Sequence, residues 1–140
     1  MSETGGNSRH ESTRFESRAQ VLESLAQKRD LTGADLSGLD LPGIRLVAVA
    51  MAGASLRGAN LSGCLLADIE ATGADLSDAR LAGATIKDAN LANAVLRGSR
   101  LQAASIKDTN LWQADLCYGD LSGAWIKDTN LANSTLRGPS

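Results

Sequence analysis

Histidine, aromatic residues and cysteine are all scarce in this chain of 140 residues. The single histidine is His10, in a polar N-terminal segment, so we expect no histidine general base in the folded part. The two cysteines have neither a histidine neighbour nor the ligand spacing of a zinc site. The serines have no base partner, and no glycine-rich phosphate loop joins a strand pattern to a helix pattern. The sequence therefore predicts a protein that is not an enzyme and that holds no cofactor and no metal.

Long hydrophobic runs are missing too. The longest apolar run, residues 44–54, already contains Arg45, so no membrane span is expected. The first 14 residues are polar and lack the apolar region of a secretory signal. We expect a single domain. We place it in the cytoplasm of a bacterium, with export by a signal-independent secretion system as the alternative.

Repetition is what the sequence has in abundance. The letters IKDTNL occur at Ile106 and again at Ile126, and IKDANL occurs at Ile86. From Asp30 onward the chain divides into 22 units of five residues without an insertion or a deletion. The second residue of each unit is Leu, Ile or Met except at Ala71, and the fifth is usually Ala. Such self-similarity decides the architecture before any single element is assigned.

A period of five residues fits neither a helix nor a strand. On an α-helix five steps rotate the apolar residue by about 140°, and in a strand successive leucines would fall on opposite faces. The chain must therefore bend once in each unit. The fourth residue marks the bend, since it is Gly in 11 units, Asp in five and Asn in two, and these residues tolerate turn dihedrals. Four bends close a square coil of twenty residues, which predicts an all-β solenoid of about 5.5 coils.

Units such as NLSGC, DLSDA, NLANA and DLSGA resemble the pentapeptide-repeat family, whose pattern is A(D/N)LXX. The resemblance covers residues 30–139 and implies a right-handed quadrilateral parallel β-helix, which we assign to residues 30–140. In that fold the second and fifth residues of each unit point inward. The sequence departs from the pattern at Ala71, where the inward Ile69 just before it is expected to compensate, and no unit has Phe at its centre.

The N-terminal residues follow another pattern. We expect residues 1–11 to be a disordered tail and residues 12–29 to form a capping α-helix. Thr13 and Glu16 have the spacing of a capping box, and apolar residues follow at helical spacing: Phe15, Ala19, Leu22, Leu25 and Ala26. Repeat arrays need capping units, so the helix is expected to cover the open first coil. A helix that binds a partner is the alternative.

The two cysteines are expected to be free thiols. Cys64 is the fifth residue of its unit and should point inward, whereas Cys117 is a third residue and should be exposed. They lie more than two coils apart, beyond the reach of a disulfide.

Outward residues form columns when the chain is wrapped at twenty residues per coil. Three lysines stand beside four aspartates, and we expect the two columns to neutralise each other, with a calcium-binding ribbon as the alternative: Lys87, Lys107 and Lys127; Asp68, Asp88, Asp108 and Asp128. A third column is expected to form a structural ladder of amides: Asn90, Asn110 and Asn130. A fourth column spaces its cations two coils apart, either for solubility or as a track for an anion: Arg57, Arg97 and Arg137.

The C-terminal coils hold the candidate interaction residues. Trp112, Tyr118 and Trp125 occupy outward positions within one coil, and such residues are enriched at binding hot spots. The last coil should also leave part of its apolar floor uncovered, including Leu131 and Leu136. We predict a homodimer joined through this C-terminal coil, with one different partner protein at the same end as the alternative.

These features favour a non-enzymatic scaffold that presents flat faces and a docking end to another, unidentified protein. The family resemblance implies a second reading, a DNA mimic that binds type II topoisomerases such as gyrase. The charge is weak for a mimic, because residues 30–139 hold 12 acidic and nine basic residues. A third reading, suggested by the opening DLTGADLSGLDLPG, is a module associated with a bacterial secretion system. We expect no direct binding to nucleic acid and none to membranes.

Overall fold

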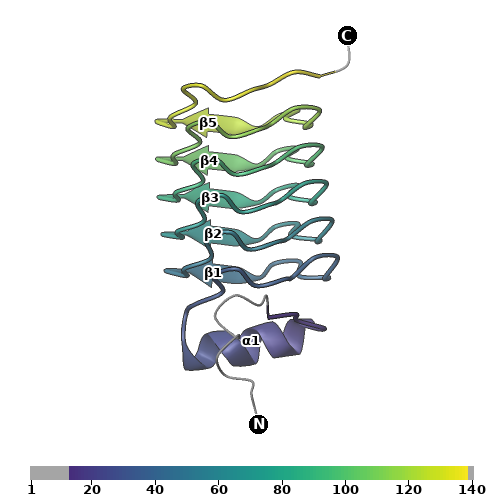
Figure 1. Ribbon diagram of the computed structural model, residues 1–140. Coiled ribbons are helices and arrows are strands. Elements are labelled where there is room, and N and C mark those ends of the chain that lie inside the picture. Colours follow the sequence, from purple (N-terminus) through teal and green to yellow (C-terminus); the bar gives the residue numbers. More distant parts are fainter. Residues whose placement is uncertain (1–12, 139–140) are drawn as a thin grey trace.

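The computed structural model describes residues 13–138, which form one helix and a stack of coils (Figure 1). The helix is α1 (Arg18–Gln27), and the strands are β1 (Arg45–Val47), β2 (Leu65–Ala67), β3 (Thr85–Lys87), β4 (Ser105–Lys107) and β5 (Trp125–Lys127). The strands form one parallel sheet in the order β1-β2-β3-β4-β5. Partners such as Ile86 and Ile106 lie twenty residues apart, so the five strands span four full turns. The predicted parallel β-solenoid is confirmed.

The other sides of each coil pair through single bridges with the same register. Asp75 pairs with Val95 and Asn90 with Asn110, again in parallel and twenty residues apart. The fourth residue of each unit makes the corner: Gly83 has φ +68° and Asp88 has φ +50°. A Cβ added at Gly83 would meet no atom within 4 Å, so glycine serves there for its backbone conformation and not for lack of space.

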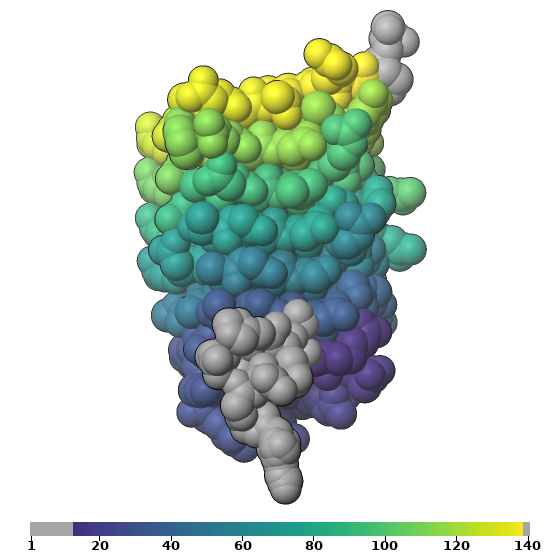
Figure 2. Space-filling model, in the orientation of Figure 1, coloured from purple at the N-terminus to yellow at the C-terminus, as the bar shows by residue number. Residues whose placement is uncertain are grey.

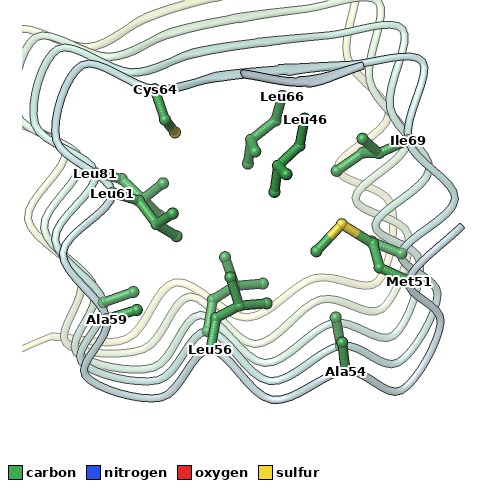
Figure 3. Packing of buried hydrophobic residues seen from close by; sticks show 14 of the residues in the cluster. Leu46, Met51, Ala54, Leu56, Ala59, Leu61, Cys64, Leu66, Ile69 and Leu81 are labelled. Atoms are coloured by element: carbon green, nitrogen blue, oxygen red, sulfur yellow. The ribbon is translucent and has the colours of Figure 1, made fainter. Parts of the chain in front are cut away.

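Inward side chains fill the interior of the square (Figure 3). Leu46, Leu56 and Leu66 are at most 1% exposed, and the smaller Ala54 and Ala59 fill the positions between such leucines. At the one unit that lacks a large second residue, Ala71 and Ile69 are both buried, as the sequence predicts. The core is therefore a narrow column of aliphatic layers, which explains how the chain folds with so few aromatic residues.

The N-terminal cap differs from the prediction at its start. Thr13 and Phe15 are extended and pair with Asp35: the Phe15 N–H donates to the Asp35 carbonyl at 3.0 Å, and the Asp35 N–H donates to the Thr13 carbonyl at 2.8 Å. The expected capping box at Thr13 is therefore wrong, because these residues add an extra rung to the solenoid. The helix begins at Arg18 instead, and the Ser17 hydroxyl accepts the N–H of Gln20 at 3.2 Å.

The helix covers the first coil with its buried residues Val21 and Leu25. It lies across the end of the stack, beneath β1 in Figure 1. The predicted disordered tail, residues 1–11, lies outside the described residues.

Ser99 carries a buried hydroxyl that finds no hydrogen-bond partner within residues 13–138. It occupies a fifth position, where alanine is usual. We expect Ser99→Ala to raise the free energy of unfolding by about 1 to 3 kcal/mol, because an unsatisfied buried polar group is removed. Denaturant melts measure the change. The matched variant Ser134→Ala should lower stability or leave it unchanged, since the Ser134 hydroxyl donates to the Leu131 carbonyl at 2.6 Å. Stabilisation by Ser134→Ala equal to that by Ser99→Ala would contradict the explanation.

Candidate interaction surface

The apolar floor becomes exposed at the last coil. Second-position residues are buried as far as Leu116, whereas Leu121 and Leu131 are only partly buried. Ile126 is 39% exposed and Leu136 is 54% exposed. Figure 2 shows this end opposite the one that carries the helix. Side chains of the core type thus meet the surface at one end of the described stack.

The three outward aromatic residues do not form one patch. Trp112, Tyr118 and Trp125 are 38%, 50% and 53% exposed, as their outward positions predict. They lie on three different sides of the coil, because their units belong to three different ladders. Cations accompany two of them: the Arg97 guanidinium lies 4.9 Å from the centre of the Tyr118 ring, and Lys127 Nζ lies 5.9 Å from that of Trp125. The three aromatic residues are close in sequence, but the corners of the square coil place them on different sides.

The arginine column is engaged with aspartates of the following coil. Arg57 contacts Asp75 at 3.1 Å, and Arg97 contacts Asp115 at 3.3 Å. These ion pairs reduce the charge available to an anion, so they weigh against the anion track.

Cys117 belongs to the same column, between Arg97 and Arg137. It is only 8% exposed, and the prediction of an exposed thiol is wrong. Cys117 lines one groove together with Arg97, Asp115 and Arg137. Cys64 points inward as expected, and burial raises the pKa of its thiol to about 12. Both cysteines are free.

The amide column forms hydrogen bonds from coil to coil. Asn110 Nδ2 donates to Asn90 Oδ1 at 3.3 Å, and Asn130 Nδ2 donates to Asn110 Oδ1 at the same distance. The ladder continues to a carboxylate, because Asn90 Nδ2 donates to Glu70 Oε2 at 2.7 Å. Sequence reasoning missed Glu70, although it lies twenty residues before Asn90.

The aspartate column lines an open groove of about 780 Å³ beside this ladder: Asp68, Asp88, Asp108 and Asp128. Among residues 13–138 no ion pair within 4 Å joins these carboxylates to Lys87, Lys107 or Lys127, so the expected charge pairing does not form. The described residues also contain no group of three or more His, Cys, Asp or Glu side chains placed to hold a metal ion, so nothing supports a calcium ribbon.

Several aspartates have lowered pKa values because the turn that follows donates hydrogen bonds to them. The Ser37 hydroxyl donates to Asp35 at 2.6 Å, and the Ser122 hydroxyl donates to Asp120 at 2.5 Å. These contacts lower the pKa of each carboxyl below its ordinary value of 3.8. The backbone N–H of Cys117 donates to Asp115 Oδ1 at 2.9 Å and likewise lowers the pKa of Asp115.

Acid should therefore destabilise the fold. A carboxyl with a lowered pKa in the folded state stabilises the protein above its unfolded pKa of about 3.9, and this stabilisation is lost as the pH falls through the folded value. We expect the melting temperature to be flat near neutral pH and to fall below about pH 4. Thermal melts across this range check the effect. Ser122→Ala should move the pKa of Asp120 back towards its ordinary value in an NMR titration, and an unmoved pKa would contradict the assignment.

A parallel solenoid with a corner in every five-residue unit and an aliphatic interior defines a class of repeat protein. The chain belongs to the pentapeptide-repeat family: eight copies of the pattern described as Pentapeptide repeats match residues 30–68, 74–113 and 94–133. The resemblance found in the sequence is thus confirmed. No curated protein matches the chain. Between residues 13 and 138, no helix is both long and apolar enough to cross a membrane.

Two solved structures illustrate the likeness. A pentapeptide repeat protein from the Arabidopsis thaliana thylakoid lumen is 32% identical, with a TM-score of 0.64 over 66% of this chain and 64% of that one. QnrB1, a plasmid-mediated fluoroquinolone resistance protein, is 22% identical in its trypsin-treated R167E form, with a TM-score of 0.57 over 78% of this chain and 62% of that one. The chain thus spans slightly less than two thirds of both structures. The likeness to QnrB1 concerns the fold alone.

Proposed function

We propose that the protein is a non-enzymatic scaffold that binds another protein through its C-terminal coil. The observation that carries the proposal is the exposure of Ile126 and Leu136, whose equivalents Ile106 and Leu116 are buried one coil earlier. Burying apolar surface is the main favourable term in protein association. Tyr118 and Trp125 stand on two sides of the same region and can extend the contact around its edge. A bacterial cytoplasmic location is part of the proposal and is tested by cell fractionation.

The alternative occupant of this coil is a second copy of the chain, in a homodimer. Two copies related by a two-fold axis would cover each other's exposed leucines and close the assembly. Light scattering on the purified protein at tens of micromolar separates this arrangement from a monomer that awaits a different partner.

The test of the docking end is Leu131→Lys. Lysine at this partly buried position places a charge in the apolar floor, so binding of a partner or of a second copy should be lost. The matched control is Ala132→Lys, which adds the same charge to an exposed side chain one residue further on. Affinity purification from the native host and light scattering are run on both variants. A Leu131→Lys protein that keeps every wild-type association would overturn the proposal.

A second candidate function is binding to a type II topoisomerase as a DNA mimic. It is favoured by the column of four aspartates, one per coil, whose carboxylates form no ion pair with any residue from 13 to 138. The column is sparse, because coils about 4.8 Å apart compare with one charge per about 1.7 Å of B-DNA. Inhibition of gyrase supercoiling is the measurement. Activity that survives Asp88→Asn with Asp108→Asn would exclude the column as its cause.

A further inference from the structure

The backbone hydrogen bonds give each coil a polarity. In every unit, the N–H groups of the second and fourth residues and the C=O group of the fifth residue point towards the following coil. Thus Leu96 N–H donates to Asp115 O at 2.7 Å, and Gly98 N–H donates to Cys117 O at 2.9 Å. Ala94 C=O accepts from Asp115 N–H at 3.0 Å. The C-terminal edge of a coil therefore offers two donors for each acceptor.

The opposite edge has the reverse composition. In each unit, the N–H group of the first residue and the C=O groups of the first and third residues point towards the preceding coil. Asp115 supplies both of its own groups in this way, and Cys117 supplies a carbonyl. The N-terminal edge is therefore rich in acceptors, and the two edges complement each other only head to tail.

At the last coil no residue of the described range, 13–138, pairs with the donor-rich edge. The N–H groups of this edge that find no backbone acceptor within residues 13–138 include those of Gly123, Ile126, Asp128, Leu131, Asn133 and Leu136. Three C=O groups lie between them, likewise without a partner in the described chain: those of Ala124, Thr129 and Ser134. Two copies stacked about a two-fold axis would bring donors against donors, and at best half of the N–H groups could be paired. Burying unpaired N–H groups is costly, so an acceptor-rich edge fits better than a second C-terminal edge.

The column of arginines adds a charge requirement. Arg57 and Arg97 each contact an aspartate eighteen residues further on, in the next coil. Arg137 is the next arginine of this column, and it makes no ion pair within residues 13–138. A coil stacked on this end would satisfy Arg137 by placing a carboxylate at the equivalent position.

The chain's own acceptor-rich edge is closed to this contact. Thr13 and Phe15 occupy the backbone groups of Asp35, and α1 covers the first coil with Val21 and Leu25. A second copy of the capped chain therefore cannot supply the edge that the C-terminal coil requires.

We propose that the C-terminal edge binds, head to tail, the uncapped N-terminal edge of another parallel β-helix built from five-residue repeats, with a carboxylate facing Arg137. The cap, α1, keeps the chain from stacking on itself in the same way. This inference names the partner of the docking end and rests on the proposed function above.

The test is to remove the cap from the full chain with Val21→Asp and Leu25→Asp. Aspartates on the buried face should release α1 and expose the acceptor-rich edge on every side except that of Asp35, which Thr13 and Phe15 still occupy. This variant should therefore form concentration-dependent head-to-tail oligomers in sedimentation velocity, whereas the wild type stays monomeric. Added wild-type protein should shorten the oligomers, because it offers a C-terminal edge but no free N-terminal one. The matched control is Leu22→Asp, on the exposed side of the same helix, which should behave as wild type.

Further variants separate the contact from nonspecific aggregation. Adding Leu131→Lys to the uncapped chain should restore a monomer with the solenoid's circular dichroism. Arg137→Glu should weaken the association about tenfold or more, and Arg137→Lys should preserve most of it. If the double variant unfolds, Val21→Asp or Leu25→Asp alone is the milder form to compare.

Three results would overturn the inference. A two-fold dimer of the wild type that Leu131→Lys abolishes would overturn the inference but would support the proposed docking end. A folded, uncapped chain that remains monomeric would contradict the edge complementarity. If the uncapped chain still associates with Leu131→Lys added, and if added wild-type protein does not shorten the oligomers, both the inference and the proposed docking end would be contradicted.

Discussion

Leu91→Asp is expected to lower the free energy of unfolding by about 4 kcal/mol or more, a large fraction of the stability of a protein of this size. Leu91 is 1% exposed and points into the aliphatic interior, where its neighbours along the stack are Ala71 and Leu111. No cation lies among the buried residues of this core to pair with a carboxylate. Circular dichroism and denaturant melts of the purified variant measure the loss.

The control places the same carboxylate on the outside of a neighbouring unit. Ala82 is an exposed third residue, so Ala82→Asp should change the free energy of unfolding by about 0.5 kcal/mol or less. Lys107→Ala, also at an exposed third position, should have a similarly small effect. Losses of stability equal to that of Leu91→Asp would mean that the inward and outward positions have been assigned wrongly.

The repeated part of the fold could be predicted from the sequence because one residue pattern fixes both the bend and the face. A leucine at every fifth position can be buried only if the chain turns once per unit, and residues such as Gly83 or Asp88 show where it turns. Because every unit carries the same pattern, a single unit that departs from it, such as the one with Ala71, does not change the fold that the other units predict. The register of the sheet then follows from the twenty-residue spacing.

The N-terminal cap could not be predicted in the same way, because local and long-range interactions compete there. Thr13 and Glu16 carry the local signal of a helix start, yet the free edge at Asp35 offers backbone hydrogen bonds that extended residues can complete. The pairing with Asp35 prevails, and the helix starts one turn later, at Ser17. The sequence of residues 13–16 does not by itself show that the backbone of Asp35 lies beside them in the folded protein.

Side-chain contacts between coils were also beyond a reading of single positions. Cys117 is buried although it occupies an outward position, and it lines one groove with Arg97 and Arg137, which belong to the coils before and after it. Trp112, Tyr118 and Trp125 were close in sequence, yet each corner of the square turns the chain onto another side. What could have been found is Glu70, since its place in the Asn90 ladder follows from the twenty-residue period alone.

Removing one full coil should leave a folded protein. Deletion of residues 86–105 joins Thr85 to Ile106 and gives the sequence TIKDTN in place of TIKDAN, so every later residue keeps its side and its inward or outward direction. The new neighbours are compatible, because β3 would continue as Thr85, Ile106 and Lys107 beneath β5. In repeat proteins stability is roughly a sum over units and their interfaces, so we expect a lower melting temperature with an unchanged type of circular dichroism spectrum.

Deletion of one residue more should have a far larger effect. Without residues 86–106, Thr85 is joined to Lys107, so either a lysine occupies an inward position or all later leucines move to the wrong face. The hydrogen bonds between coils would lose their register at the same point, because the N–H groups of the second and fourth residues of each unit reach carbonyls nineteen residues ahead, as Leu96 reaches Asp115. We expect the C-terminal coils to unfold, which hydrogen exchange would record as lost protection after residue 85. If both deletions left equally protected coils, the solenoid would tolerate a change of register, and a strict twenty-residue period would not be what holds it together.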